Sequence, residues 1–137
     1  MGTTYAEITL RNAGDVTDAR REYIKETEIR QITIQSLADT GAGTLVITES
    51  IQKELGLATV FLRESHVANG TKVMTMVAEP VMVCWEDRSM TCDPWVLPGA
   101  DKVLLGAIPL EGMDLMVDPI HQRLVGVHGD KPVGMIY

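Results

Sequence analysis

One aspartate in this sequence stands where its charge has no evident structural purpose. Asp39 follows the apolar pair Leu37-Ala38 and precedes Thr40 and Gly41. A lone carboxylate at the end of a buried strand, beside a hydroxyl and a glycine that permits close backbone approach, suits a loop that meets a second copy of itself. Two carboxyl groups about 3 Å apart do not both ionise easily, so they share a proton. The ionised group then activates water while the protonated group donates to a carbonyl, which is amide hydrolysis without a covalent intermediate.

The remaining aspartates do not repeat this pattern. None of them is followed by Thr-Gly or Ser-Gly, so one chain does not supply both carboxylates. We therefore expect a two-fold symmetric homodimer in which each copy contributes Asp39, and an inert monomer. The alternative role for Asp39 is a turn residue whose carboxylate accepts from the backbone of Gly41 or Ala42. An aspartate-led phosphoryl-transfer loop is excluded, because it needs a second aspartate at the position of Gly41.

The composition limits the class of protein. A chain of 137 residues fits one domain with a sizeable core. Nineteen acidic against 12 basic residues give a formal charge of -7, so no nucleic-acid partner is expected. No secretion signal opens the chain, and no apolar run approaches the roughly 20 residues of a membrane span, so we expect a cytoplasmic protein with no membrane partner. The only cysteines, Cys84 and Cys92, are expected to be reduced thiols without metal-ligand spacing, and no metal or other cofactor is expected.

Short strands are expected to position Asp39. The alternating segment Thr3–Leu10 predicts a strand that Asn12 to Asp15 break. Asp18 to Glu28 is dominated by charge and predicts a solvated excursion, with strand-like character near Tyr23. Ile29 to Leu37 has mostly period-two spacing and predicts the strand that leads to Asp39.

The segment after the Asp39 loop predicts a strand and a helix. Leu45–Ile47 reads as a short buried strand. Thr48 is placed to be the N-cap of a helix of about two turns, and Gly56 is placed to end it. The sequence therefore predicts one well-delimited helix in a chain that is otherwise mostly β.

Beyond Leu57, turn signals recur at regular intervals and predict hairpins. Phe61 to Val67 and Thr71 to Val77 are expected to pair across Asn69-Gly70, which tolerates positive φ. Val81 to Trp85 and Met90 to Leu97 are expected to pair next, with Cys84 facing Cys92 across the strands.

The last third of the chain predicts one buried strand and a final hairpin. Val103 to Gly106 reads as the strand, and a turn or single helical turn follows as far as Met113. Leu115–Val117 is expected to pair with Arg123–Val125, with Asp118 starting the intervening turn. Residues 127–137 are expected to form a C-terminal arm.

Three separated matches carry a resemblance to a known family. Leu37 to Ala42 is similar to the apolar-apolar-Asp-Thr-Gly-Ala active-site loop of retropepsin-like aspartic proteases. Val103 to Gly106 resembles the hydrophobic-hydrophobic-Gly segment that packs beside that loop. The hairpin tipped by Asn69-Gly70 lies between the two, where such proteases carry the flap that closes over substrate. The resemblance covers about residues 30 to 126. Within it, the chain looks more like the cellular and bacterial members of the family than the viral ones.

The resemblance implies an all-β, homodimeric fold: a closed barrel or sandwich of hairpins with one or two short helices. It implies an aspartic endopeptidase acting on peptides or proteins, with a catalytic loop of Asp39, Thr40 and Gly41. The substrate-binding residues that it implies are Ala42, Gly43, Thr44, Ala68, Asn69, Gly70, Thr71 and Leu105. The alternative is a catalytically silent dimeric module that binds peptides on the same fold.

The sequence also departs from the family pattern. Viral relatives carry an aspartate and an arginine that pair with each other at the positions of Gly43 and Ala107, so another contact must support the dimer here. The N-terminal strand and the tail from Val127 are the candidates, with Met113, Met116 and Met135 as further interface candidates. Ala42 lacks the hydroxyl that pepsins place there, which predicts a less acidic working range than that of pepsin.

Overall fold

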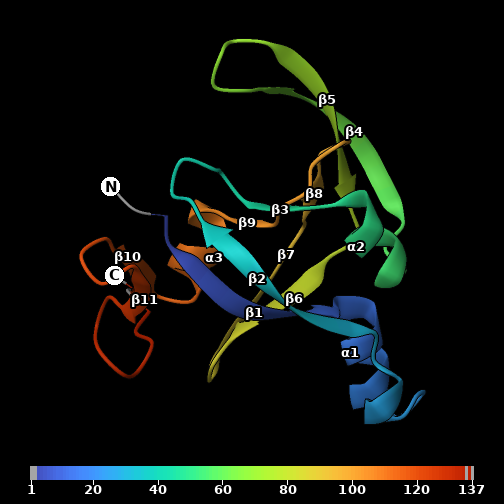
Figure 1. Ribbon diagram of the computed structural model, residues 1–137. Helices are drawn as coiled ribbons and strands as arrows, with labels where there is room; N and C mark the ends of the chain where they lie inside the picture. The colour runs from blue at the N-terminus through green and yellow to red at the C-terminus, as the bar shows by residue number, and fades with distance from the viewer. Residues whose placement is uncertain (1–2, 135, 137) are drawn as a thin grey trace.

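The chain folds into a strongly curved sheet of nine strands and a separate two-stranded hairpin (Figure 1). The computed structural model describes residues 3–134 and 136. The strand order across the large sheet is β4-β5-β8-β3-β9-β2-β1-β6-β7. Its strands are β1 (Tyr5–Asn12), β2 (Gln31–Ala38), β3 (Leu45–Ile47), β4 (Thr59–His66), β5 (Lys72–Ala78), β6 (Val81–Trp85), β7 (Arg88–Cys92), β8 (Trp95–Val96) and β9 (Leu104–Leu105). The other elements are the β10 (Leu115–Asp118) and β11 (Arg123–Gly126) hairpin, helices α1 (Ala13–Arg20), α2 (Glu49–Glu54) and α3 (Ala107–Gly112), and the 3-10 turn η1 (Glu26–Glu28).

The mostly β architecture with few short helices agrees with the fold class expected from the sequence. The core gathers the inward side chains of the curved sheet with those of α2 and α3. Among them, Ile8, Leu10 and Val83 are almost completely buried, and so is Met113, which therefore is not an exposed interface residue. Met135 lies outside the described residues. No helix within residues 3–134 and 136 is long and apolar enough to cross a membrane.

The predicted strands that flank Asp39 are both present. β1 and β2 pair antiparallel, with Ile8 opposite Ile34. In β1, Ala6 and Ile8 face the core while Glu7 and Tyr5 are exposed, which is the alternation seen in the sequence. The β2 strand then delivers the chain to Asp39, as its period-two pattern predicts.

The charged segment after β1 corrects one prediction, because it begins with helix α1. Asn12 does end β1, but its side-chain oxygen also caps the helix by accepting from the N–H of Asp15 at 3.0 Å. The Asp15 carboxylate in turn receives the Arg30 guanidinium at 2.8 and 2.9 Å. Tyr23, expected to be strand-like, is 74% exposed and lies in a bend. The helix buries only Asp15 and Val16, so its sequence shows no apolar stripe.

The predicted helix and the first predicted hairpin are confirmed. The Thr48 hydroxyl accepts from the N–H of Ile51 at the start of α2, and Gly56 has a φ of +65° after its end. β4 and β5 pair from Thr59 to His66 with a register shift near Phe61. At the tip Gly70 has a φ of +84°, the conformation for which a glycine was expected.

The second hairpin exists, but its register corrects the expected cysteine pair. Trp85 pairs with Arg88 across a two-residue turn, so Cys84 lies opposite Ser89 and Cys92 lies opposite Val81. The two thiols therefore do not face each other. The expected long strand Met90 to Leu97 also divides, because Pro94 separates β7 from β8, and β8 pairs with β3 and β5 instead.

The final hairpin β10–β11 is present as predicted. The Asp118 carboxylate accepts from the backbone of Ile120 and His121, which confirms its role in starting the turn. The buried guanidinium of Arg88 joins this hairpin to the tail. It donates to the carbonyl oxygens of Met113 at 3.0 Å, Asp114 at 2.8 Å and Gly129 at 2.6 Å. Residues 135 and 137 of the expected arm lie outside the described residues.

Candidate active site

Asp39 lies at the end of β2, where strands from three parts of the chain meet. β9 is inserted between β2 and β3 (Figure 1). Leu104 pairs with Leu37 in a parallel sense, and Leu105 pairs with Leu45 in an antiparallel sense. The prediction that Val103 to Gly106 packs beside the Asp39 loop is thus confirmed.

Backbone hydrogen bonds hold the Asp39 loop against this strand. The N–H of Asp39 donates to the carbonyl oxygen of Leu105 at 3.0 Å. In return, the N–H of Ala107 donates to Ala42 O at 2.8 Å, and the N–H of Ile108 donates to Gly43 O at 3.2 Å. The Asp39 loop and the segment from β9 into α3 each donate and accept these main-chain hydrogen bonds. The position of the loop therefore depends on main-chain groups more than on side chains.

Gly106 makes this close approach possible. A Cβ atom at position 106 would lie 2.2 Å from Thr44 O and 2.5 Å from Ala42 O. Real side chains do not tolerate such distances, so the position requires glycine for steric reasons. This is the physical basis of the hydrophobic-hydrophobic-Gly pattern in the sequence.

The Asp39 carboxylate is half-buried, and its Oδ1 accepts from the N–H of Gly41 at 2.9 Å. The turn role weighed for Asp39 is therefore real. Within residues 3–134 and 136 this is the hydrogen bond that its carboxylate makes, and it forms no ion pair there. Oδ2 thus stays available for a water molecule or for another carboxyl group. Thr40 and Gly41 are exposed beside it.

A groove of about 730 Å³ runs along Asp39 and Thr40. Its walls are largely apolar and come from the end of β2, helix α3 and strand β10. Met116 in this groove is 49% exposed, so its apolar side chain is open to solvent there. The lining residues are Thr3, Thr4, Leu37, Ala38, Asp39, Thr40, Ala107, Leu110, Glu111, Leu115, Met116, Val117 and Pro119.

The β4–β5 hairpin projects from the same side of the molecule. In Figure 1 its tip curls above the loop that joins β2 to β3. Ala68, Asn69, Gly70 and Thr71 are all exposed at this tip, where Asn69 Oδ1 accepts from the N–H of Thr71 at 2.9 Å. The apolar side chains that the hairpin exposes are Val60, Phe61, Leu62, Val67 and Met74.

Two of the predicted substrate-binding residues have buried side chains. Leu105 is completely buried and Thr44 is 3% exposed, so neither side chain reaches a ligand from its present position. Leu105 instead supports Asp39 through its carbonyl oxygen. The structure does bring Ala42 and Gly43 into the same loop as Asp39, half-buried and exposed respectively.

Two residues of α3 that line the groove, Leu110 and Glu111, are not among the site residues predicted from the sequence. Together with Ala107 they follow an i, i+3, i+4 spacing, which places them on one face of a helix. That spacing was the available signal, but the segment is so short that it reads equally well as a turn.

No protein-family model matches this chain, and no curated protein matches it. Several solved structures are similar to it, among them two protease-like domains. One is the retroviral protease-like domain of Ddi1 from Leishmania major, with a TM-score of 0.59 and 14% identity over 96% of this chain and 94% of that chain. The other is a retropepsin-like aspartic protease from Rickettsia conorii, with a TM-score of 0.50 and 17% identity over 85% of this chain and 77% of that chain. These likenesses show a retropepsin-like fold and confirm the resemblance seen in the sequence.

Proposed function

We propose that this chain, which has a retropepsin-like fold, is an aspartic endopeptidase whose site forms when two copies bring their Asp39 residues together. The observation that carries the proposal is the state of Asp39 itself. It is fixed by backbone bonds to β9, half-buried, and left with one uncommitted carboxylate oxygen beside an open groove. A single carboxylate in that position is half of an acid–base pair.

In the proposed dimer the two carboxyl groups share one proton across the two-fold axis. The ionised Asp39 takes a proton from a bound water, which attacks the scissile carbonyl. The protonated Asp39 donates to the carbonyl oxygen. Collapse of the tetrahedral intermediate, with proton transfer to the leaving nitrogen, then breaks the C–N bond. The exposed Thr40 is the residue placed to hydrogen-bond between the two loops.

The groove beside Asp39 supports a second copy as its occupant. An apolar surface that includes the half-exposed Met116 and the exposed Pro119 is stabilised when a partner covers it. Thr4 lies at the same place and already accepts from the N–H of Ala38 at 2.9 Å. Contacts of the second copy with this apolar surface would replace the ion pair that Gly43 and Ala107 do not provide.

The exposed hairpin tip supports an extended peptide as substrate. A flexible hairpin that closes over a cleft excludes water and offers backbone groups for strand-like pairing. Asn69 and Gly70 are at that tip, and Ala42 and Gly43 are in the loop below it. We propose that these four residues contact the substrate backbone.

The test is cleavage of a mixed peptide library by the wild-type chain, by Asp39→Asn, and by mixtures of the two. Because each active dimer needs two Asp39 residues, an equal mixture should retain about a quarter of the wild-type activity after subunit exchange. A site complete in one chain would retain about half. Asp18→Asn, on α1 at the opposite end of β1, is the matched control and should cleave like wild type.

Ultracentrifugation of Asp39→Asn completes the design. A dimer that persists without cleavage shows that the carboxylate acts in chemistry rather than in folding. Wild-type dimers that bind library peptides and cleave none would overturn the enzyme proposal in favour of the silent binding module.

A further inference from the structure

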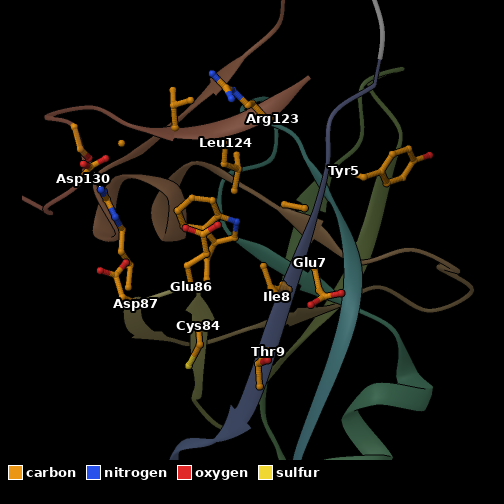
Figure 2. Close-up of a pocket in the computed structure, with 16 residues that line it drawn as sticks. Tyr5, Glu7, Ile8, Thr9, Cys84, Glu86, Asp87, Arg123, Leu124 and Asp130 are labelled. Carbon is orange, nitrogen blue, oxygen red and sulfur yellow. Dashed lines mark hydrogen bonds between the residues drawn. The ribbon is translucent and has the colours of Figure 1, made fainter. Parts of the chain in front are cut away.

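A second groove, larger than the groove at Asp39, lies elsewhere and shares no lining residue with it. It has a volume of about 1150 Å³. Figure 2 shows it between the first half of β1, the end of the β6–β7 hairpin, β11 and the tail. Its walls are formed by Tyr5–Thr9, Cys84–Arg88, Arg123–Gly126, Gly129 and Asp130.

One wall of this groove is an unpaired strand edge. The ladder between β1 and β6 runs from Asn12 only as far as Thr9, which lies opposite Cys84. Tyr5 and Glu7 continue β1 beyond that point, and β2 is their one strand partner in the described part of the chain.

The hydrogen-bond pattern shows where their backbone groups point. Ala38 N donates to Thr4 O and Asn12 N donates to Arg30 O, so the even-numbered residues of β1 bond to β2. In an antiparallel ladder the alternate residues bond to the other side. The N–H and C=O groups of Tyr5 and Glu7 therefore point toward the groove, ready to pair with an added strand.

The charge around this edge is mainly negative. Glu7, Glu86, Asp87 and Asp130 all line the groove and are exposed. Figure 2 shows Glu86, Asp87 and Asp130 at one end and Glu7 on the β1 wall. The lining cations are Arg123 and Arg88.

Arg88 hydrogen-bonds to backbone carbonyl oxygens and not to these carboxylates, and the four lining carboxylates outnumber the two lining arginines. Its terminal nitrogens already donate to three carbonyl oxygens, and the residue is 5% exposed. Its Nε is buried and has no acceptor within the described residues.

We propose that this groove docks a lysine- or arginine-rich segment of another protein in an extended conformation. The segment adds a strand to β1 by pairing with the backbone of Tyr5 and Glu7. Its cationic side chains reach the carboxylates of Glu86, Asp87 and Asp130. The half-buried Trp85 and the exposed Tyr5 provide apolar contact between these charges. The site is independent of Asp39 and holds its ligand without cutting it.

The probe is a blocked hexapeptide of alternating lysine and valine, titrated at low salt into the full chain carrying Asp39→Asn so that cleavage does not interfere. Backbone pairing predicts slower hydrogen exchange at the amides of Tyr5 and Glu7. Occupancy also predicts slower alkylation of Cys84, which lines this groove, with no change at the Asp39 loop.

Three controls test the charge preference, the strand pairing and the location of the binding site separately. A glutamate–valine peptide of the same length tests charge and should bind at least about tenfold more weakly. The lysine–valine peptide with alternate N-methylated amides tests strand pairing and should lose the protection of Tyr5 and Glu7. Asp130→Lys should weaken binding about fivefold, whereas the matched charge change Glu54→Lys on α2 should leave it unchanged.

Several results would overturn the proposal. One is the absence of binding up to about 1 mM peptide at low salt. Another is binding that protects the Asp39 loop and leaves Cys84 and the β1 amides unchanged. Protection of Tyr5 and Glu7 that rises with protein concentration in the absence of peptide would assign the groove to a second copy of this chain instead.

Discussion

The backbone N–H of Asp39 donates to the carbonyl oxygen of Leu105 at 3.0 Å, which ties the candidate catalytic residue to a strand from the last third of the chain. Gly106, the next residue, fits directly under the carbonyls of Ala42 and Thr44. The candidate active site is therefore held by a crossing of two loops, and its geometry is sensitive to any atom added there.

Gly106→Ala is expected to destabilise the protein by about 1–3 kcal/mol, because its Cβ would push against two backbone carbonyls that cannot move independently. Urea denaturation measures the loss. Gly43→Ala is the matched control, since a Cβ there meets no atom within 4 Å, and its free energy of unfolding should change by less than about 1 kcal/mol. Equal effects of the two substitutions would contradict the steric argument.

Asp15→Asn is expected to lower the free energy of unfolding at neutral pH. The Arg30 side chain holds the pKa of Asp15 below its ordinary value of 3.8, against the opposing effect of burial. A carboxyl whose pKa is lower in the folded state stabilises the fold above its unfolded-state pKa, and this contribution is lost as the pH falls through the folded-state value.

The difference between wild type and Asp15→Asn should be about 1–2 kcal/mol at pH 7, since asparagine still offers an acceptor to the backbone of Arg30. Urea titrations at a series of pH values below 4 should show this difference shrinking. A difference that is independent of pH would mean that the charge of Asp15 is not its cause.

Cys84 is expected to react with iodoacetamide at least about tenfold faster than Cys92 in the native protein. Burial raises the pKa of the Cys84 thiol, and burial together with the Asp93 carboxylate raises the pKa of Cys92 to about 11. Peptide mapping by mass spectrometry measures both rates, and unfolding in urea should make them equal.

Mild oxidation should not join the two cysteines within one folded chain. Cys92 lies three ladder positions from Ser89, the partner of Cys84, which is an offset of about 10 Å along the strand. Disulfides require Cα atoms within about 7 Å. An intramolecular Cys84–Cys92 bond in the native protein would contradict this register.

Arg88→Met is expected to cost about 2–4 kcal/mol, because it leaves the buried carbonyl oxygen of Met113 and the partly buried carbonyl oxygen of Gly129 without this donor. Arg123→Met is the matched control on the neighbouring β11, where the arginine side chain is 65% exposed, and should change stability by less than about 0.5 kcal/mol. Thermal and urea denaturation compare the two variants. A small loss for Arg88→Met would show that water replaces its contacts.

The elements that could be predicted from the sequence are those whose capping and turn residues match the conformation found in the structure. The Thr48 cap and Gly56 stop delimit α2, and the glycine in Asn69-Gly70 supplies the positive φ of its hairpin. The packing of Val103 to Gly106 beside the Asp39 loop was predicted through the resemblance to a known family, and the structure supplies its steric reason at Gly106.

Other features depend on contacts that no local pattern encodes. Helix α1 buries little apolar surface and is stabilised by its N-cap and by the Asp15–Arg30 pair. Its charged sequence therefore resembles that of a solvated loop. The cysteine register depends on Glu86 adopting a positive φ in a two-residue turn. The burial of Thr44 and Leu105 follows from the insertion of β9 between β2 and β3, which only the tertiary structure reveals.

The insertion of β9 between β2 and β3 also sets a time order for biosynthesis. Ribosomes make the Asp39 loop before β9, the strand that fixes it, and residues 40–103 are made between the two. Pairings between such distant segments form slowly, since the intervening chain must first be brought together. A nascent chain therefore carries Asp39 in a loop without fixed geometry until β9 has been synthesised and has paired with β2 and β3.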